Sequence, residues 1–189
     1  VTEGLLEFRR AAGYELAWVS ASRGSRTGEP SVLMMRPCSL QAHSLLARLR
    51  AQLAHDLPSQ LALFTEGHGL LLSAALHLQL LEGLDGSPSP HSNEEVRRRV
   101  AAYVFGPRTF ESSVSVLTRF VEDHQNDLHQ ISSRERALIN ARVRDRRSWE
   151  QARARADLPS LSSAMRGLRG ALRSLALISD PTLAQDWGP

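Results

Sequence analysis

The strongest constraint on the fold is the spacing of apolar residues between positions 110 and 128. They recur at alternating steps of four and three residues, which is the spacing of one face of an α-helix. The positions on this seam are Phe110, Val114, Leu117, Val121, His124 and Leu128. The pattern predicts a helix over about 108–129. Its apolar face either packs on the protein's own core or forms a homodimer through all the seam residues except His124.

Comparable spacing predicts most of the remaining chain to be helical. Residues 40–56 form one such helix, which Pro58 is expected to end, and residues 59–82 form a second with a weak point at Gly67 and Gly69. Asn93 is the expected cap of a helix over 94–105.

One β-hairpin is expected near the N-terminus. Residues 14–20 alternate between apolar and polar, residues 31–35 are an apolar run, and the stretch between them is rich in Gly, Ser and Arg. Two strands alone are marginally stable, so the hairpin must pack on helices or pair with another chain.

These elements define a mainly α protein with an N-terminal β-hairpin. We expect a hairpin and helical core over 1–82, a linker over 83–93 (GLDGSPSPHSN), a helical pair over 94–131, a basic three-helix unit over 132–178 and a loosely held tail over 179–189. No stretch carries the roughly 20 apolar residues of a bilayer span, so no membrane association is expected.

Charge is distributed unevenly along the chain. All 23 basic residues are arginine, which reflects either codon bias or selection for the guanidinium group. Residues 132–178 hold 11 arginines against 4 acidic residues, a net charge of +7, whereas the remainder has a net charge of −4. The asymmetry indicates a segment that faces a polyanion. The alternative is a basic face paired with the protein's own acidic part.

The basic segment has the signals of three short helices. Ser132 with Glu135 and Ser148 with Gln151 fit capping boxes. The polar stretch 144–147 between them is the expected turn, and an unbroken helix through it is the alternative. Pro159 and Ser160 precede a third helix over 161–177. That helix carries an apolar stripe and a separate arginine stripe: Leu161, Met165, Leu168, Leu172 and Leu175 form the first, and Arg166, Arg169 and Arg173 the second.

Residues 132–177 resemble the helix-turn-helix of sigma-factor region 4 and of LuxR-type regulators. Ser133-Arg134-Glu135-Arg136 matches the opening of that motif, and residues 162–166 stand at the start of its recognition helix. The resemblance implies a DNA-binding regulatory protein that contacts duplex DNA through its C-terminal helices as a dimer. The residues assigned to DNA are Arg144, Arg146, Arg147, Ser162, Ser163, Arg166, Arg169 and Arg173.

The alternative hypothesis is a non-enzymatic adaptor, or a delivered effector, whose basic face binds an acidic protein surface. A third hypothesis is an enzyme or small-ligand binder that uses the hairpin and the apolar helix pair. No phosphate-loop or nucleophile-elbow motif is present, so no enzymatic activity and no cofactor are expected. Asp123 with Asp127, or His124 with Asp127, has the spacing of two metal ligands on one helix face, but the five-residue gap between His124 and His129 does not fit such a site. A buried, hydrogen-bonded His124 is the preferred interpretation, and no metal is expected. The lone Cys38 favours a reducing compartment, and we expect a cytoplasmic location.

Overall fold

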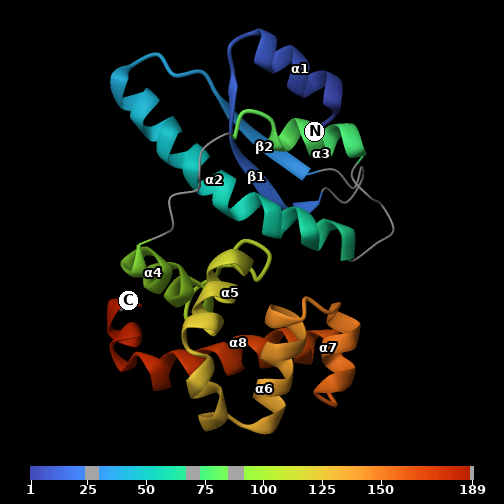
Figure 1. Ribbon diagram of the computed structural model, residues 1–189, viewed down its shortest axis with the longest axis vertical. Helices are drawn as coiled ribbons and strands as arrows, with labels where there is room; N and C mark the ends of the chain where they lie inside the picture. Colours follow the sequence, from blue (N-terminus) through green and yellow to red (C-terminus); the bar gives the residue numbers. More distant parts are fainter. Residues whose placement is uncertain (24–29, 67–72, 85–91, 188–189) are drawn as a thin grey trace. The chain divides into compact units, whose positions relative to one another are not determined.

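The computed structural model describes residues 1–23, 30–66, 73–84 and 92–187 (Figure 1). The chain divides into two compact units, unit 1 over Val1–Pro90 and unit 2 over His91–Pro189. The expected helical pair 94–131 and the basic segment 132–178 therefore belong to one unit. The prediction of a mainly α fold with an N-terminal β-hairpin is confirmed.

Unit 1 combines the hairpin with three helices. Helix α1 spans Glu3–Ala11 and leads through Gly13, whose φ is +79°, into strand β1 over Glu15–Arg23. Strand β2, Pro30–Met35, pairs antiparallel with β1, and Trp18 lies opposite Leu33 in the register. Helix α2, Leu40–Glu66, packs on β1, and helix α3, Ala74–Leu81, packs on α1 and α2. The core of unit 1 comprises Leu6, Leu16, Val19, Leu53, Leu57, Leu61, Leu76 and Leu80.

Helix α2 runs through Pro58, so the expectation of a helix end there is wrong. A proline inside a helix removes one hydrogen bond to the carbonyl four residues earlier. Leu57 and Leu61, on either side of Pro58, are at most 2% exposed, and their burial holds both halves of the helix against the core. Pro58 itself is exposed. The weak point expected at Gly67 and Gly69 lies outside the described residues.

Unit 2 is built around α8, Leu161–Ser179. The other helical segments in chain order are α4 (Asn93–Val104), α5 (Val114–Asp123), the 3-10 segment η1 (Gln125–Gln130), α6 (Ser133–Ile139), the π-helical segment η2 (Asn140–Arg144), α7 (Trp149–Arg155) and the 3-10 segment η3 (Pro181–Trp187). Of these, α4, η1, α6, α7 and η3 pack against α8, whereas α5 packs on α4 and η2. The inward side of α8 is fully buried at Leu168, Leu172 and Leu175. A Cβ on Gly167 would lie 3.0 Å from Leu138 Cδ1, so this glycine lets α6 and α8 approach closely.

Several sequence-based expectations for unit 2 are corrected. Helix α5 begins at Val114 and not near 108, and Ser92 rather than Asn93 caps α4 by accepting the Glu95 N–H at 3.2 Å. Leu161 and Met165 are 37% and 44% exposed, so they do not belong to the buried stripe of α8.

The segment after α8 is not a loose tail. Leu183, in η3, is 1% exposed, and η3 packs on α4 and α8. A buried leucine anchors this segment to the core of unit 2.

The seam of the expected dimer helix faces the interior. Phe110, Val114, Leu117, Val121 and Leu128 are all at most 5% exposed. This is the core-packing arrangement that the sequence left open. Because the seam is already covered, a homodimer cannot use it; whether the chain dimerises through another surface stays a prediction. None of the helices in the described part of the chain combines the length and apolar character that a bilayer span requires.

Both predicted capping boxes are present, and the first holds a charged carboxylate. Burial raises the pKa of the Glu135 carboxyl, but hydrogen bonds from the Ser132 hydroxyl and N–H and from the Ser174 hydroxyl outweigh it, so the pKa is lowered. The donors lie 2.7, 3.0 and 2.9 Å from the carboxylate oxygens, respectively. Glu135 therefore joins the start of α6 to α8 as a carboxylate.

This arrangement predicts a pH-dependent stability of unit 2. Because the pKa of Glu135 is lower in the folded state than in the unfolded state, its stabilisation is complete above the unfolded pKa, near 4.5, and is lost as pH falls through the folded pKa. Glu135→Gln should lower the urea midpoint at neutral pH, and this difference should shrink in acid. Trp149 fluorescence in a Trp18→Phe, Trp187→Phe background reports the transition. The exposed Glu122→Gln is the control, and a pH-independent difference for Glu135→Gln would contradict the prediction.

Candidate nucleic-acid interface

The turn between α6 and α7 carries three exposed arginines within four residues. The π-helical segment η2 ends where the Asp145 N–H bonds the Asn140 carbonyl at 2.8 Å, and Arg146 then takes a φ of +51°. We call residues 144–147 the basic turn. Its three arginines are exposed, as the sequence predicted for a turn and not for an unbroken helix.

A buried arginine fixes the base of this turn. Arg142 is 4% exposed, and its guanidinium lies over the rings of Phe110, at 4.8 Å, and Trp149, at 4.9 Å. Its Nη1 donates to the carbonyl of Arg147 at 2.7 Å. The cation–π contacts and the hydrogen bond hold the end of the basic turn against the core. Sequence reasoning missed this role, although Leu138, four residues earlier, places Arg142 on a core-facing side of the helix.

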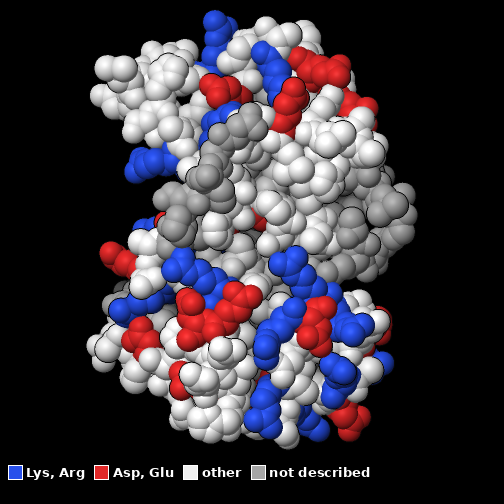
Figure 2. All heavy atoms as spheres, in the orientation of Figure 1, with Lys and Arg blue, Asp and Glu red and all other residues white. Residues whose placement is uncertain are grey.

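The cations around the turn differ in their local partners. Arg155 pairs with Asp145 at 3.2 Å, and Arg144 donates to the amide oxygen of Asn140 at 3.3 Å. Within the described part of unit 2, Arg146 and Arg147 have no side-chain hydrogen bond, ion pair or ring contact. These two guanidinium groups are therefore available to an external anion. Figure 2 shows arginines gathered over the part of unit 2 where Figure 1 draws α6 and α7.

The three arginines of the α8 stripe have different surroundings, whereas the sequence predicted that all three contact DNA. Arg166 is exposed, whereas the guanidinium of Arg173 lies over the ring of Phe105 at 5.1 Å. Arg169 donates to the carbonyls of Tyr103, Gly106 and Arg108 at 2.6, 2.5 and 2.7 Å. Arg169 thus satisfies carbonyl groups at the C-terminal end of α4, and it is not available to DNA or another ligand.

The ring of Tyr103 completes this internal arginine site. The Arg169 guanidinium lies 4.6 Å from the ring centre. Burial raises the pKa of the Tyr103 hydroxyl to about 12, and the positive charge of Arg169 offsets only part of that rise. The hydroxyl therefore stays protonated at neutral pH.

The start of α8 is only partly open to a ligand. Ser160 caps the helix by accepting the N–H of Ser163 at 3.1 Å, and the two serine hydroxyl oxygens lie 2.9 Å apart. Ser162 is exposed and Ser163 is half-buried. Of the two serines assigned to phosphate contact, only Ser162 presents its side chain openly.

His124 and Asp127, which have the spacing of metal ligands, form other contacts. His124 Nδ1 lies 2.9 Å from the Phe120 carbonyl, and Asp127 accepts a hydrogen bond from Ser179 at 2.7 Å. Among the described residues, no three histidine, cysteine or carboxylate side chains gather in a way that could hold a metal ion.

Comparison with known proteins changes the functional interpretation. No family model matches the chain. Over 179 residues, the chain is 26% identical to a protein of Nitrosococcus halophilus (strain Nc4) named tRNA(Met) cytidine acetyltransferase TmcA. The match covers 93% of this chain and 24% of the relative, so the chain spans about a quarter of the length of the curated relative that it matches.

This finding corrects two expectations. A relative named for the acetylation of cytidine in tRNA contradicts the assignment of a DNA-binding transcription regulator, and it also contradicts the expectation of a protein unrelated to enzymatic activity. The physical reason for the error is that arginine on a helical surface recognises phosphate in DNA and RNA alike. The likeness of residues 132–177 to helix-turn-helix proteins stays a prediction.

The three bonds of Arg169 predict a specific cost of replacing its guanidinium. Arg169→Lys keeps the charge but cannot present a planar fork to three carbonyls, and it should lower the free energy of unfolding by about 1–3 kcal/mol. Arg166→Lys, one helical turn earlier at an exposed position, should change it by less than about 0.5 kcal/mol. Urea unfolding followed by Trp149 fluorescence measures both. Equal effects of the two substitutions would show that the carbonyl cluster does not stabilise the fold.

Proposed function

We propose that this chain is the tRNA-binding part of a tRNA-acetylating enzyme and that unit 2 contacts the phosphate backbone through the basic turn. The observation that carries the proposal is the pair of exposed guanidinium groups of Arg146 and Arg147, held on a turn that Arg142 anchors. The resemblance to a tRNA acetyltransferase selects RNA as the polyanion.

The geometry of the basic turn suits a structured phosphate backbone. An arginine fork binds a phosphate group with two parallel hydrogen bonds, and its charge is retained at any physiological pH. Because the backbone of the turn is fixed by the buried Arg142, less conformational freedom is lost on binding than for a mobile basic loop. Such contacts carry little sequence information, so they position an RNA rather than select its bases.

Other parts of unit 2 have supporting roles in this proposal. Arg144, Arg166 and the exposed Ser162 supply further backbone contacts, whereas Arg142 and Arg169 act inside the protein. A cytoplasmic location, where tRNA is present, accords with the exposed free thiol of Cys38. An acidic protein surface as a partner also stays a prediction.

The proposal predicts salt-dependent binding of tRNA that depends on the basic turn. Arg146→Gln with Arg147→Gln should weaken the binding of a fluorescent tRNA(Met) transcript roughly tenfold and reduce the slope of log K against log salt by about 1 for each arginine. Fluorescence anisotropy between about 50 and 200 mM salt measures both quantities.

A matched control separates the basic turn from a general charge effect. Arg48→Gln removes an exposed arginine of α2 in unit 1 and should leave the tRNA affinity nearly unchanged. Absence of tRNA binding at low salt, or an equal loss in the Arg48 variant, would refute the proposed function. Circular dichroism of each variant confirms that the fold is intact.

A further inference from the structure

Strand β2 has the composition of an inner strand, although β1 is its only partner among the described strands. Its sequence, PSVLMM, has no charged residue, and its single proline stands at the first position. Natural edge strands are protected by charges, bulges or internal prolines, because an unprotected edge pairs with other chains. Strand β1 has such protection, since it carries Glu15 and Arg23 and its register is interrupted twice. The hairpin therefore has a protected strand and an unprotected one.

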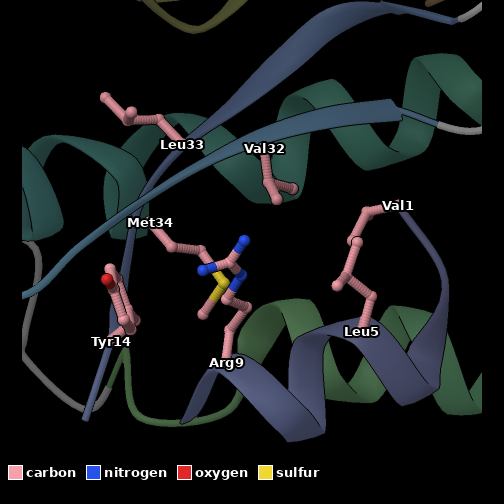
Figure 3. Close-up of a pocket in the computed structure, with 7 residues that line it drawn as sticks. All are labelled: Val1, Leu5, Arg9, Tyr14, Val32, Leu33 and Met34. Atoms are coloured by element: carbon pink, nitrogen blue, oxygen red, sulfur yellow. The ribbon is translucent and has the colours of Figure 1, made fainter. Parts of the chain in front are cut away.

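A groove runs beside the unprotected strand. It has a volume of about 350 Å³ and lies between α1 and β2 (Figure 3). Figure 3 shows Val32 and Met34 directed from β2 towards α1, with Leu5 and Arg9 rising from α1 on the opposite side. Val1 lies at one end, where its nitrogen donates to the carbonyl of Pro30 at 2.8 Å.

Apolar side chains of α1 and of the hairpin are incompletely covered, and two of them, Leu5 and Leu33, line the groove. Leu5 and Phe8 of α1 are 48% and 67% exposed. On the hairpin, Trp18 and Leu33 form a directly opposed pair, and they are 48% and 49% exposed. Single exposed apolar residues are common, but two that line a groove beside an unpaired strand edge mark a surface that another element covers.

We propose that a further β-strand pairs with the outer edge of β2 and that its side chains fill the groove between α1 and β2. The strand comes from the polypeptide that lies outside the matched quarter in a protein of this kind. This inference rests on the proposed function, because it takes the chain to work within a larger tRNA acetyltransferase. It makes the hairpin part of a wider sheet with β2 inside and β1 at the margin.

The nature of the occupant follows from the chemistry of the site. A strand edge offers backbone N–H and C=O groups at a regular spacing, and an extended segment satisfies them while alternate side chains enter the adjacent groove. The groove lining is mostly apolar, and the guanidinium of Arg9 lies 5.4 Å from the ring centre of Tyr14. The occupant is therefore an extended, predominantly apolar strand. The relative has about three quarters of its length outside the match, which gives ample polypeptide to supply it.

Hydrogen exchange tests the pairing directly. The chain is compared by itself and inside a chimera, in which it replaces the matching stretch of the Nitrosococcus halophilus protein. Amides in the β2 peptide should exchange at least about tenfold more slowly in the chimera than in the isolated chain. Equal rates overturn the proposal, as does a chimera that is insoluble while the parent protein is soluble. Protection that grows with the concentration of the isolated chain identifies a second copy as the occupant and also overturns it.

Two substitutions provide a matched check. Leu33→Lys places a charge beside the proposed new strand, and it should lower the melting temperature of the chimera but not that of the isolated chain. Leu78→Lys changes a 67% exposed leucine of α3, away from the groove, and should affect both proteins equally. Equal behaviour of the two variants counts against the proposal.

The Arg146→Gln, Arg147→Gln variant of the chimera distinguishes the two proposals. It should lose tRNA affinity while it keeps the protection of β2. The Leu33→Lys variant of the chimera should lose the slow hydrogen exchange of the β2 amides while it keeps its affinity for tRNA. That result would show that the strand interface and the RNA surface are separate.

Discussion

Unit 2 depends on the burial of one side of α8. Leu168, Leu172 and Leu175 are completely excluded from solvent, and α4, α6 and α7 all pack on this helix. Burial of each such side chain stabilises the fold by about 1.5–3 kcal/mol, which exceeds the contribution of any surface ion pair here. The close approach of α6 at Gly167 also brings Ser174 to the carboxylate of Glu135. The position of the basic turn, which follows α6 and η2, is therefore set by the packing around α8.

The arginines of unit 2 divide into structural and exposed groups. Arg142 and Arg169 lie against aromatic rings and donate to backbone carbonyls, so they act as internal connectors between segments distant in sequence. Arg146, Arg147 and Arg166 are exposed. Guanidinium suits both roles because it is planar, carries several donors and stacks on aromatic rings. The arginines of this segment thus include structural residues as well as the exposed ones of the proposed contact with RNA.

Unit 1 and unit 2 expose different kinds of groups that another molecule can contact. Unit 1 presents an unprotected strand and exposed apolar side chains, which another polypeptide segment can cover. Unit 2 buries its apolar core and exposes the guanidinium groups of Arg146, Arg147 and Arg166. In the functions proposed above, the first surface attaches the chain to the rest of a larger enzyme and the second contacts RNA.

The sequence by itself determined the helical class, the hairpin, both capping boxes and the turn at 144–147. Those features depend on local spacing and on hydrogen bonds between residues three or four apart, which a sequence displays directly. Only the tertiary structure decided that α2 continues through Pro58, that the seam of α5 is buried, and that Arg169 faces α4 while Arg166 faces solvent. Each of these outcomes depends on contacts between residues far apart in the chain. Periodicity shows which residues share a helix face, but the partner of that face is set by the packing of the whole unit.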